Sequence, residues 1–313
     1  MEVPTTEHLT GPTPAMPQQK RTRVKRSSSS WWYHTANWLG LLPFLLFCLI
    51  FEILPALMLL QGSFNDNQGA FTFGNYQHMF AQSGTIHAFE TSIELSLVSA
   101  VISTILGFFA AYGVYRLHSN WLRNLITGFS SLTANFAGVP LAFAFISTLG
   151  VTGFVTVLLR NVLHIDLYNL GFSLYNFWGL VLTYVYFELP LMVLITLPSL
   201  SALRPEWSEA ATNLGASNLT YWRKVALPVL MPSLVAALML LFANAFGAYA
   251  TAYALAQGGI NLVTILISFA VAGNVSIDVG LGNALAMGMV IVLCLAVSLY
   301  TYMLRRASLW QGR

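Results

Sequence analysis

Charged residues are scarce in this 313-residue chain. Asp, Glu, Lys and Arg together make up 8% of the sequence, whereas hydrophobic residues make up 57%. The mean hydropathy of +0.68 lies outside the range of soluble globular domains. The chain is therefore predicted to be a membrane protein. Its net charge of +3 does not indicate nucleic-acid binding, because membrane topology can account for where the basic residues stand.

Cysteine is nearly absent, and the histidines are dispersed. Cys48 and Cys294 both fall inside predicted spans, where a small polarizable side chain packs well without a disulfide. The six histidines never occur at metal-ligand spacing with a paired Cys, His or Glu. We expect no metal site in this chain.

The sequence also lacks the residues of an enzyme or a nucleotide site. None of the three lysines, Lys20, Lys25 and Lys224, follows a glycine, so the chain has no P-loop to hold ATP phosphates. No Gly-x-Ser-x-Gly or other nucleophile arrangement occurs, so no catalytic residue is predicted. If ATP drives this protein, another chain must bind it.

Residues 1–30 differ in composition from the rest. They are rich in Pro, Thr, Gln and Ser and contain a basic run at 20–26, which predicts a disordered cytoplasmic tail. The rival interpretation, a cleaved signal peptide, is less favoured because the basic run stands far from the N-terminus and the next apolar stretch can span a membrane. An aromatic group at 31–33 is typical of an interfacial anchor.

Six apolar stretches have the length that a transmembrane helix needs. They lie at about 38–60, 91–115, from near 125, and at about 175–197, 229–256 and 281–304. The third is the least defined, because Gly138, Pro140, Gly150 and Gly153 interrupt it; we expect one span plus a re-entrant or interfacial segment. The fold class is therefore an all-α membrane protein with six transmembrane helices.

The basic residues predict the orientation of the spans. Of fourteen Lys and Arg, all but Arg160 fall in the N-terminal tail, in two loops predicted to be internal, or at the C-terminal end. By the positive-inside rule both termini are cytoplasmic. A transmembrane domain at 31–306 would then be followed by a short cytoplasmic tail at 307–313.

A polar interval between two long apolar runs carries residues with helical spacing. Trp207, Ala210, Ala211 and Leu214 fall on one face of a helix, and the two alanines would let another backbone come close. Pro205 is tolerated in a first helical turn. This face is predicted to be a docking surface.

The same interval predicts a break and a second helix. Gly215 can take the left-handed conformation that closes a helix, and Ser217 or Asn218 can cap the next one. Pro228 is expected to end that helix. The result would be two short amphipathic helices at 205–214 and 217–226.

The spacing of this interval resembles the signature of permease subunits of type I ATP-binding-cassette (ABC) importers. The order is an acidic residue and two alanines, three residues, glycine, nine residues, an aliphatic residue, one residue, and Leu-Pro. The matching positions are Glu209-Ala210-Ala211, Gly215, Val225 and Leu227-Pro228.

The resemblance implies a role for the loop at about 199–228. In that family the loop is cytoplasmic and passes motion from the ATPase to the spans. The implied ATPase-coupling residues are Trp207, Glu209, Ala210, Ala211, Leu214 and Gly215. The alternatives are a surface helix pair without a partner, lipid-headgroup anchoring by Trp207, and a purely topological role for Arg204, Arg223 and Lys224.

The resemblance also implies partners. A dimer of ABC ATPase subunits would hold ATP and Mg, so this chain itself would bind no cofactor. A second permease subunit, homologous or identical, and an extracytoplasmic solute-binding protein would complete the assembly in the lipid bilayer of a bacterial cytoplasmic (inner) membrane. Transport would proceed by alternating access.

Four residues are candidates for the substrate pathway. Glu188 lies near the middle of the fourth span, where a carboxylate usually faces a cavity or a partner. The alternative is that Glu188 is protonated or bonded to a neighbouring helix of a second subunit. In the fifth span Asn244, Tyr249 and Tyr253 are secondary candidates, although an aromatic stripe is more often packing.

The solute is not fixed by these residues. The segments 187–190 and 244–249 look most like permeases for polyamines, 2-aminoethylphosphonate, iron and thiamine, and a cationic solute such as a polyamine would suit an acid flanked by aromatic rings. Two rival functions stay open. One is a self-sufficient secondary transporter or channel that uses Glu188 and Glu94, and the other is a regulatory membrane scaffold.

Overall fold

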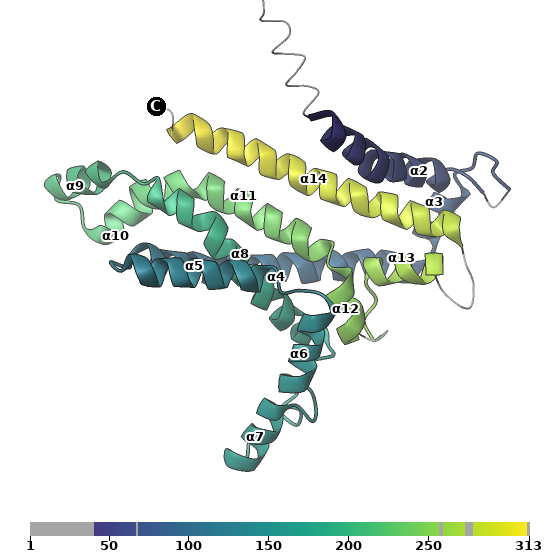
Figure 1. Ribbon diagram of the computed structural model, residues 1–313, viewed down its shortest axis with the longest axis horizontal. Coiled ribbons are helices and arrows are strands. Elements are labelled where there is room, and N and C mark those ends of the chain that lie inside the picture. Colours follow the sequence, from purple (N-terminus) through teal and green to yellow (C-terminus); the bar gives the residue numbers. More distant parts are fainter. Residues whose placement is uncertain (1–40, 67, 257–258, 273–277, 312–313) are drawn as a thin grey trace, which may run out of the picture. The chain divides into compact units, whose positions relative to one another are not determined.

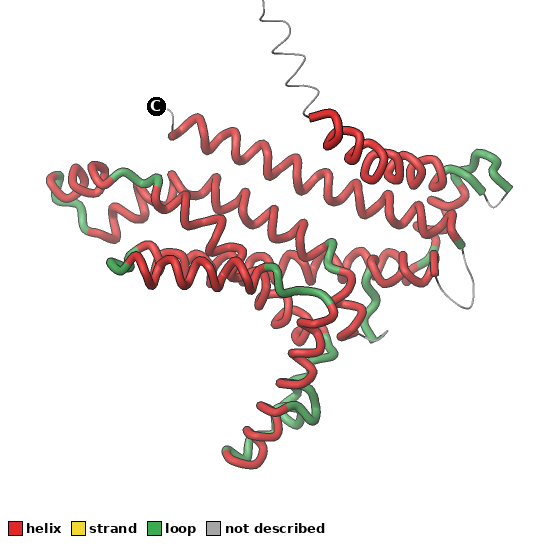
Figure 2. Tube along the Cα trace, in the orientation of Figure 1, coloured by secondary structure: helices red, strands yellow, loops and turns green. Residues whose placement is uncertain are grey.

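Helices make up most of the described chain. The computed structural model describes residues 41–66, 68–256, 259–272 and 278–311; the predicted tail at 1–30 and the aromatic anchor at 31–33 lie outside them. Among the described residues no β-strand forms, and a single isolated bridge pairs Asn65 with Phe71 (Figure 2). The predicted all-α fold is confirmed.

Six helical stretches in the described ranges are long and apolar enough to cross a bilayer. They are Leu41–Ser63, Ser83–Tyr115, Val139–Val162, Phe177–Ser201, Asn218–Phe246 and Val279–Met303. The predicted number of spans is confirmed, while the side on which the termini lie stays a prediction.

The chain divides into two units, Met1–Pro55 and Ala56–Arg313. The described part of the first unit is helical from Leu41 and contains a π-helical turn, η1 (Leu49–Ile53). The helix α2 (Leu54–Ser63) begins at the division between the units.

Within the second unit, α4 (Ser83–Tyr115) and α8 (Phe177–Ser201) form the central helix pair. The face of α4 that is buried carries a line of small side chains: Ser92, Ser96, Ser99, Ser103 and Gly107. Small residues let membrane helices approach closely where no hydrophobic effect drives them together. The helices α11 (Leu227–Phe246) and α14 (Val279–Gln311) pack beside this pair.

The third apolar region is three helices, and its breaks fall where the sequence predicts. They are α5 (Asn120–Ala134), α6 (Val139–Leu149) and α7 (Phe154–Val162). Gly138 precedes α6 with φ of 77°, and Gly150 and Gly153 separate α6 from α7. Amphipathic α5 packs against α8 and begins about five residues before the expected start of the third span. The stretch that is long and apolar enough to cross a bilayer begins later than expected, at Val139.

The fifth span begins and ends earlier in the chain than predicted. The expected helix at 229–256 is interrupted at Gly247 and Ala248, which separate α11 from α12 (Tyr249–Ala256). The hydroxyl of Tyr184 on α8 donates to the Ala248 carbonyl at 2.9 Å and so provides a partner for the broken backbone. Another helix, α13 (Val263–Ala272), follows in the segment predicted to be an external loop.

Different helices lie at the two ends of the second unit. In Figure 1, two short helices, α9 (Pro205–Asn213) and α10 (Asn218–Tyr221), lie at the same end of the bundle as the C-terminal end of α14. The helices α3 (Gly74–Ala81) and α13 lie at the opposite end. The basic loops after α4 and around α9 are thus brought to one end, as the sequence predicts.

Candidate docking site at the loop between the fourth and fifth spans

The loop after α8 folds into the predicted pair of short helices. Pro205 opens α9, and Gly215 closes it with φ of +76°, a left-handed conformation that suits glycine. The predicted cap of the second helix is Ser217, whose hydroxyl accepts from the backbone N–H of Thr220 at 3.3 Å.

Pro228 does not end the second helix, contrary to the sequence prediction. The helical path continues from Asn218 through a π-turn, η2 (Trp222–Ala226), directly into α11. The backbone N–H of Leu227 reaches the Trp222 carbonyl, one residue further back than in an α-helix. This wider turn accommodates Pro228 within the helical path. The end of the polar loop therefore continues into the fifth span without a break.

Aromatic residues anchor this element to α4. Tyr221 is buried, and Trp222 stands edge-on to Tyr112 at 5.0 Å and to Phe108 at 6.3 Å between ring centroids. Residues of α9 join the same cluster through Trp207 and Ala211. A displacement of α9 or α10 would therefore reach α4 through packed rings.

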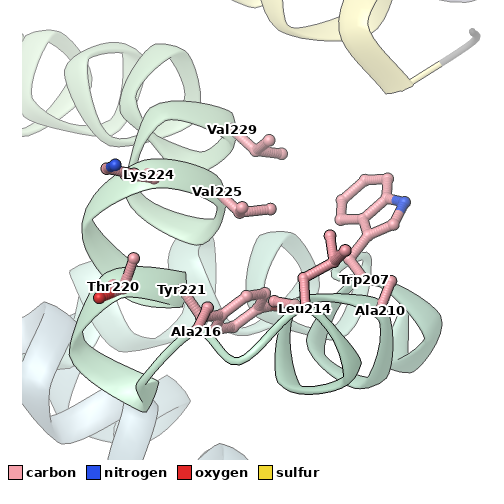
Figure 3. Close-up of a pocket in the computed structure, with 10 residues that line it drawn as sticks. Trp207, Ala210, Leu214, Ala216, Thr220, Tyr221, Lys224, Val225 and Val229 are labelled. Atoms are coloured by element: carbon pink, nitrogen blue, oxygen red, sulfur yellow. The ribbon is translucent and has the colours of Figure 1, made fainter.

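A hollow of about 510 Å³ separates α9 from the start of the fifth span (Figure 3). We call it the α9 hollow, and its lining is mostly apolar: Trp207, Ala210, Ala211, Leu214, Ala216, Thr220, Tyr221, Lys224, Val225 and Val229. Leu214 is 87% exposed. Such exposure of a large apolar side chain beside a hollow is typical of a surface that a partner covers.

The predicted docking face is therefore divided. Trp207 and Ala211 pack partly against this chain, whereas Ala210 and Leu214 are exposed at the α9 hollow. Glu209 is exposed as well. The sequence could not separate these roles, because helical spacing alone does not indicate which neighbour covers which part of a face.

The charges around α9 are free to meet a partner. Within the described residues Glu209 has neither an ion pair nor a side-chain hydrogen bond; the ion pairs found there are His87–Glu90 and Arg160–Asp166. Arg204 lies 6.0 Å from the Trp207 ring centroid. The helix α9 thus offers an unpaired carboxylate on one face and an apolar hollow on another.

Glu188 is fully buried between α8 and α4. Its Oε2 accepts a hydrogen bond from the Ser103 hydroxyl at 3.0 Å, while Oε1 has no partner. This contact pairs Glu188 with a helix of its own chain, and not with a helix of a second subunit as in the alternative interpretation. Its place in a substrate pathway stays a prediction.

Replacing Glu188 with glutamine should retain uptake and thermal stability. The amide oxygen still accepts the Ser103 hydrogen bond. Replacing Glu188 with leucine removes the acceptor and should cost about 1–3 kcal/mol of unfolding free energy. Thermal unfolding and uptake assays of both variants check this. If the glutamine variant keeps its stability but loses uptake of a cation, Glu188 belongs to the pathway instead.

The other pathway candidates lie where α11 gives way to α12. Asn244 on α11 and Tyr249 and Tyr253 on α12 are exposed, and the Tyr249 hydroxyl lies 2.8 Å from the Ser268 hydroxyl on α13. The sequence predicts one helical stripe of Phe242, Phe246, Tyr249 and Tyr253. The break between α11 and α12 divides it, so the two tyrosines do not continue the line of the two phenylalanines.

Three contacts near this break had no signal in the sequence. Thr251 both accepts from and donates to the backbone of Gly138, and the Ser92 hydroxyl accepts from the Val263 N–H. Together with the Tyr184 contact to Ala248, they join segments that are far apart in the chain. No local pattern marks such partners.

Comparisons with known proteins agree with this fold. Residues 103–308 match the family described as binding-protein-dependent transport system inner membrane component. The spermidine/putrescine transport system permease protein PotC of Haemophilus influenzae is 26% identical over 194 residues, which cover 60% of this chain and 68% of that protein. The trehalose transport system permease protein SugB of Mycobacterium tuberculosis is 31% identical over 174 residues, 55% of each chain.

A solved structure gives the same result for the fold. A chain of a bacterial ABC transporter involved in the import of the acidic polysaccharide alginate superposes with a TM-score of 0.67 at 18% identity. The match covers 89% of this chain and 98% of that one. The chain thus belongs to the family of binding-protein-dependent transport system inner membrane components, as the permease subunit of a type I ABC importer whose ATP hydrolysis takes place on a separate subunit.

Proposed function

We infer that the loop at 199–228 is the part of this permease that receives motion from the ATPase. The observation that carries the proposal is the unpaired, exposed Glu209 on α9, the short helix whose other face lines the apolar α9 hollow. A partner can cover the apolar lining, including Leu214, and pair with the carboxylate at the same time. On this proposal the loop and both termini are cytoplasmic.

The packing around the loop supports a lever mechanism. A pull on α9 or α10 acts on α11 through the continuous η2 turn and on α4 through the Trp222 and Tyr112 rings. Because α4 is packed along α8, the central pair would move as a body. ATP and Mg on a dimer of ATPase subunits would close that dimer and rock the spans between inward-open and outward-open states.

The proposed assembly has further members. A second permease subunit, homologous or identical, would complete the pathway, and an extracytoplasmic solute-binding protein would deliver the solute. One of the similar solved structures is a bacterial alginate ABC transporter in complex with an alginate pentasaccharide-bound periplasmic protein. We place this chain correspondingly in a bacterial inner membrane.

For the solute we propose a polyamine or a similar organic cation. The name of the Haemophilus influenzae relative supports this class, while that of the Mycobacterium tuberculosis relative names trehalose. Tyr249 and Tyr253 are exposed with ring centroids 5.4 Å apart, and aromatic faces attract cations. Together with Asn244 they are the proposed pathway residues, and Glu188 joins them if its glutamine variant loses cation uptake.

Reconstitution tests this function against the rival of a self-sufficient transporter. In proteoliposomes the chain alone should transport nothing under an ion gradient, whereas addition of its ATPase, second permease and solute-binding protein should give ATP-dependent uptake. Labelled spermidine, putrescine and trehalose are offered in the same assay. Uptake by the chain alone would overturn the proposal, and uptake of trehalose alone would overturn the choice of solute.

A further inference from the structure

An exposed aromatic patch lies between the end of α2 and the start of α4. Phe71 is 70% exposed and Phe73 is 58% exposed. Both rings contact the half-buried ring of Phe64, with centroids 5.7 and 5.6 Å away, and lie 5.3 Å from each other. Grouped large apolar side chains on a surface indicate a partner, since a loop in water would not keep them exposed.

The loop around this patch carries little charge. The side chain of Asp66 accepts backbone hydrogen bonds from Gln68 at 2.9 Å and Ala70 at 2.8 Å, so the one acid of the loop is used to hold its turn. The segment 64–82 contains neither Lys nor Arg. The patch therefore offers aromatic surface without charges that would select a charged protein.

Hydrogen bonds fix the loop to the end of the first span. The hydroxyl of Tyr76 donates to the Ser63 hydroxyl at 2.8 Å, and the side-chain amide of Asn75 donates to the carbonyls of Ser63 at 3.0 Å and Asn65 at 2.9 Å. Ser63 is the last residue of α2. The aromatic patch is therefore held at the level where the first span ends.

The last span begins at the same level. Met79 of α3 packs against Ala284 and Leu285 near the start of α14, and a Cβ on Gly280 would lie 2.7 Å from the Asn75 side-chain oxygen. The ends of the first and last spans are therefore joined through Asn75 and α3, which follow the patch in the chain. Span ends mark the boundary between hydrocarbon and headgroups, where aromatic side chains are enriched.

We propose that Phe71 and Phe73 anchor this loop in the bilayer interface, with their rings inserted at the boundary of headgroups and acyl chains. The patch follows α2 directly along the chain, and Leu57 and Leu60 of α2 are exposed apolar side chains. This apolar span, together with the level fixed by Ser63 and α14, selects lipid as the occupant. The inference depends on the membrane spans and is independent of the proposed coupling role and solute.

Fluorescence quenching tests the anchor. Phe71→Cys and Phe73→Cys are made separately in the full chain with Cys48→Ala and Cys294→Ala, and labelled with a small fluorophore. The control is Gln68→Cys, an exposed position in the same loop. Each protein is reconstituted in phosphatidylethanolamine and phosphatidylglycerol vesicles, and quenching by brominated acyl chains is compared with quenching by aqueous iodide.

We expect the ratio of lipid to iodide quenching at positions 71 and 73 to be several-fold higher than at position 68. Equal quenching by iodide at all three positions would overturn the anchor. Protection of positions 71 and 73 that arises only after the solute-binding protein is added would assign the patch to that protein and would also overturn it. If the Phe71→Cys variant does not fold, the quenching ratio at position 73 decides.

Discussion

Replacing Glu209 with lysine should abolish solute uptake while the chain still folds and inserts. Glu209 lies near the middle of the exposed face of α9, between Pro205 and Asn213 in helical projection. It has no partner within the described chain, so reversing its charge should change stability by less than about 0.5 kcal/mol. A like charge placed against a complementary partner surface costs several kcal/mol, which lowers uptake by more than about tenfold.

The measurement separates coupling from assembly. Uptake, ATP hydrolysis and membrane insertion of the Glu209→Lys complex are compared with those of Glu209→Gln, which removes the charge without reversing it and should have an intermediate effect. Glu90→Lys is the control, because it makes the same charge reversal at an exposed glutamate near the start of α4. Unaltered uptake in Glu209→Lys would contradict the proposed coupling role.

Local signals in the sequence were sufficient for many of the helix ends. Gly138, Gly150, Gly153 and Gly215 each stand at a helix end. Gly138 and Gly215 have positive φ, which glycine tolerates, whereas a Cβ on Gly150 or Gly153 would collide with nearby backbone. Proline was less informative. Pro228 is typical of a helix end, but a helix can continue through a proline if the preceding turn widens. The turn η2 widens in this way, and no distinct sequence pattern marks it.

Partners across the bundle were not predictable in the same way. The acid Glu188 was recognised as unusual from its position in a span, yet its partner Ser103 lies 85 positions earlier. The same applies to Tyr184, whose hydroxyl bonds to Ala248 where the fifth span breaks. A buried polar group needs a hydrogen-bond partner, but this requirement does not identify which residue provides it. The candidate docking face shows the same limit, since Trp207 turned out to face its own chain in part.

At Gly107 the helix α4 lies close against α8, and a larger side chain there is expected to have a large effect on stability. A Cβ on Gly107 would lie 2.6 Å from both Cβ and Cγ of Met192 and 3.2 Å from the Leu189 carbonyl oxygen. The Met192 Cβ is fixed to the backbone of α8, so rotation of the side chain cannot relieve the clash. The two helices would have to separate, and the Ser103 contact to Glu188, one turn away, would be stretched.

Gly107→Ala should therefore lower the free energy of unfolding by about 1–3 kcal/mol, and Gly107→Val should lower it further. Gly113 is the matched control, because it lies on the same helix and a Cβ there meets nothing within 4 Å. At that position Ala should be neutral or stabilising by up to about 1 kcal/mol, since glycine is a poor helix former. Thermal unfolding in nanodiscs is measured for alanine and for valine at each of the two positions, 107 and 113. If the valine variants at 107 and 113 unfold alike, the small-residue line of α4 does not set the distance between the central helices. The proposed motion of α4 and α8 as one body would then lack its structural basis.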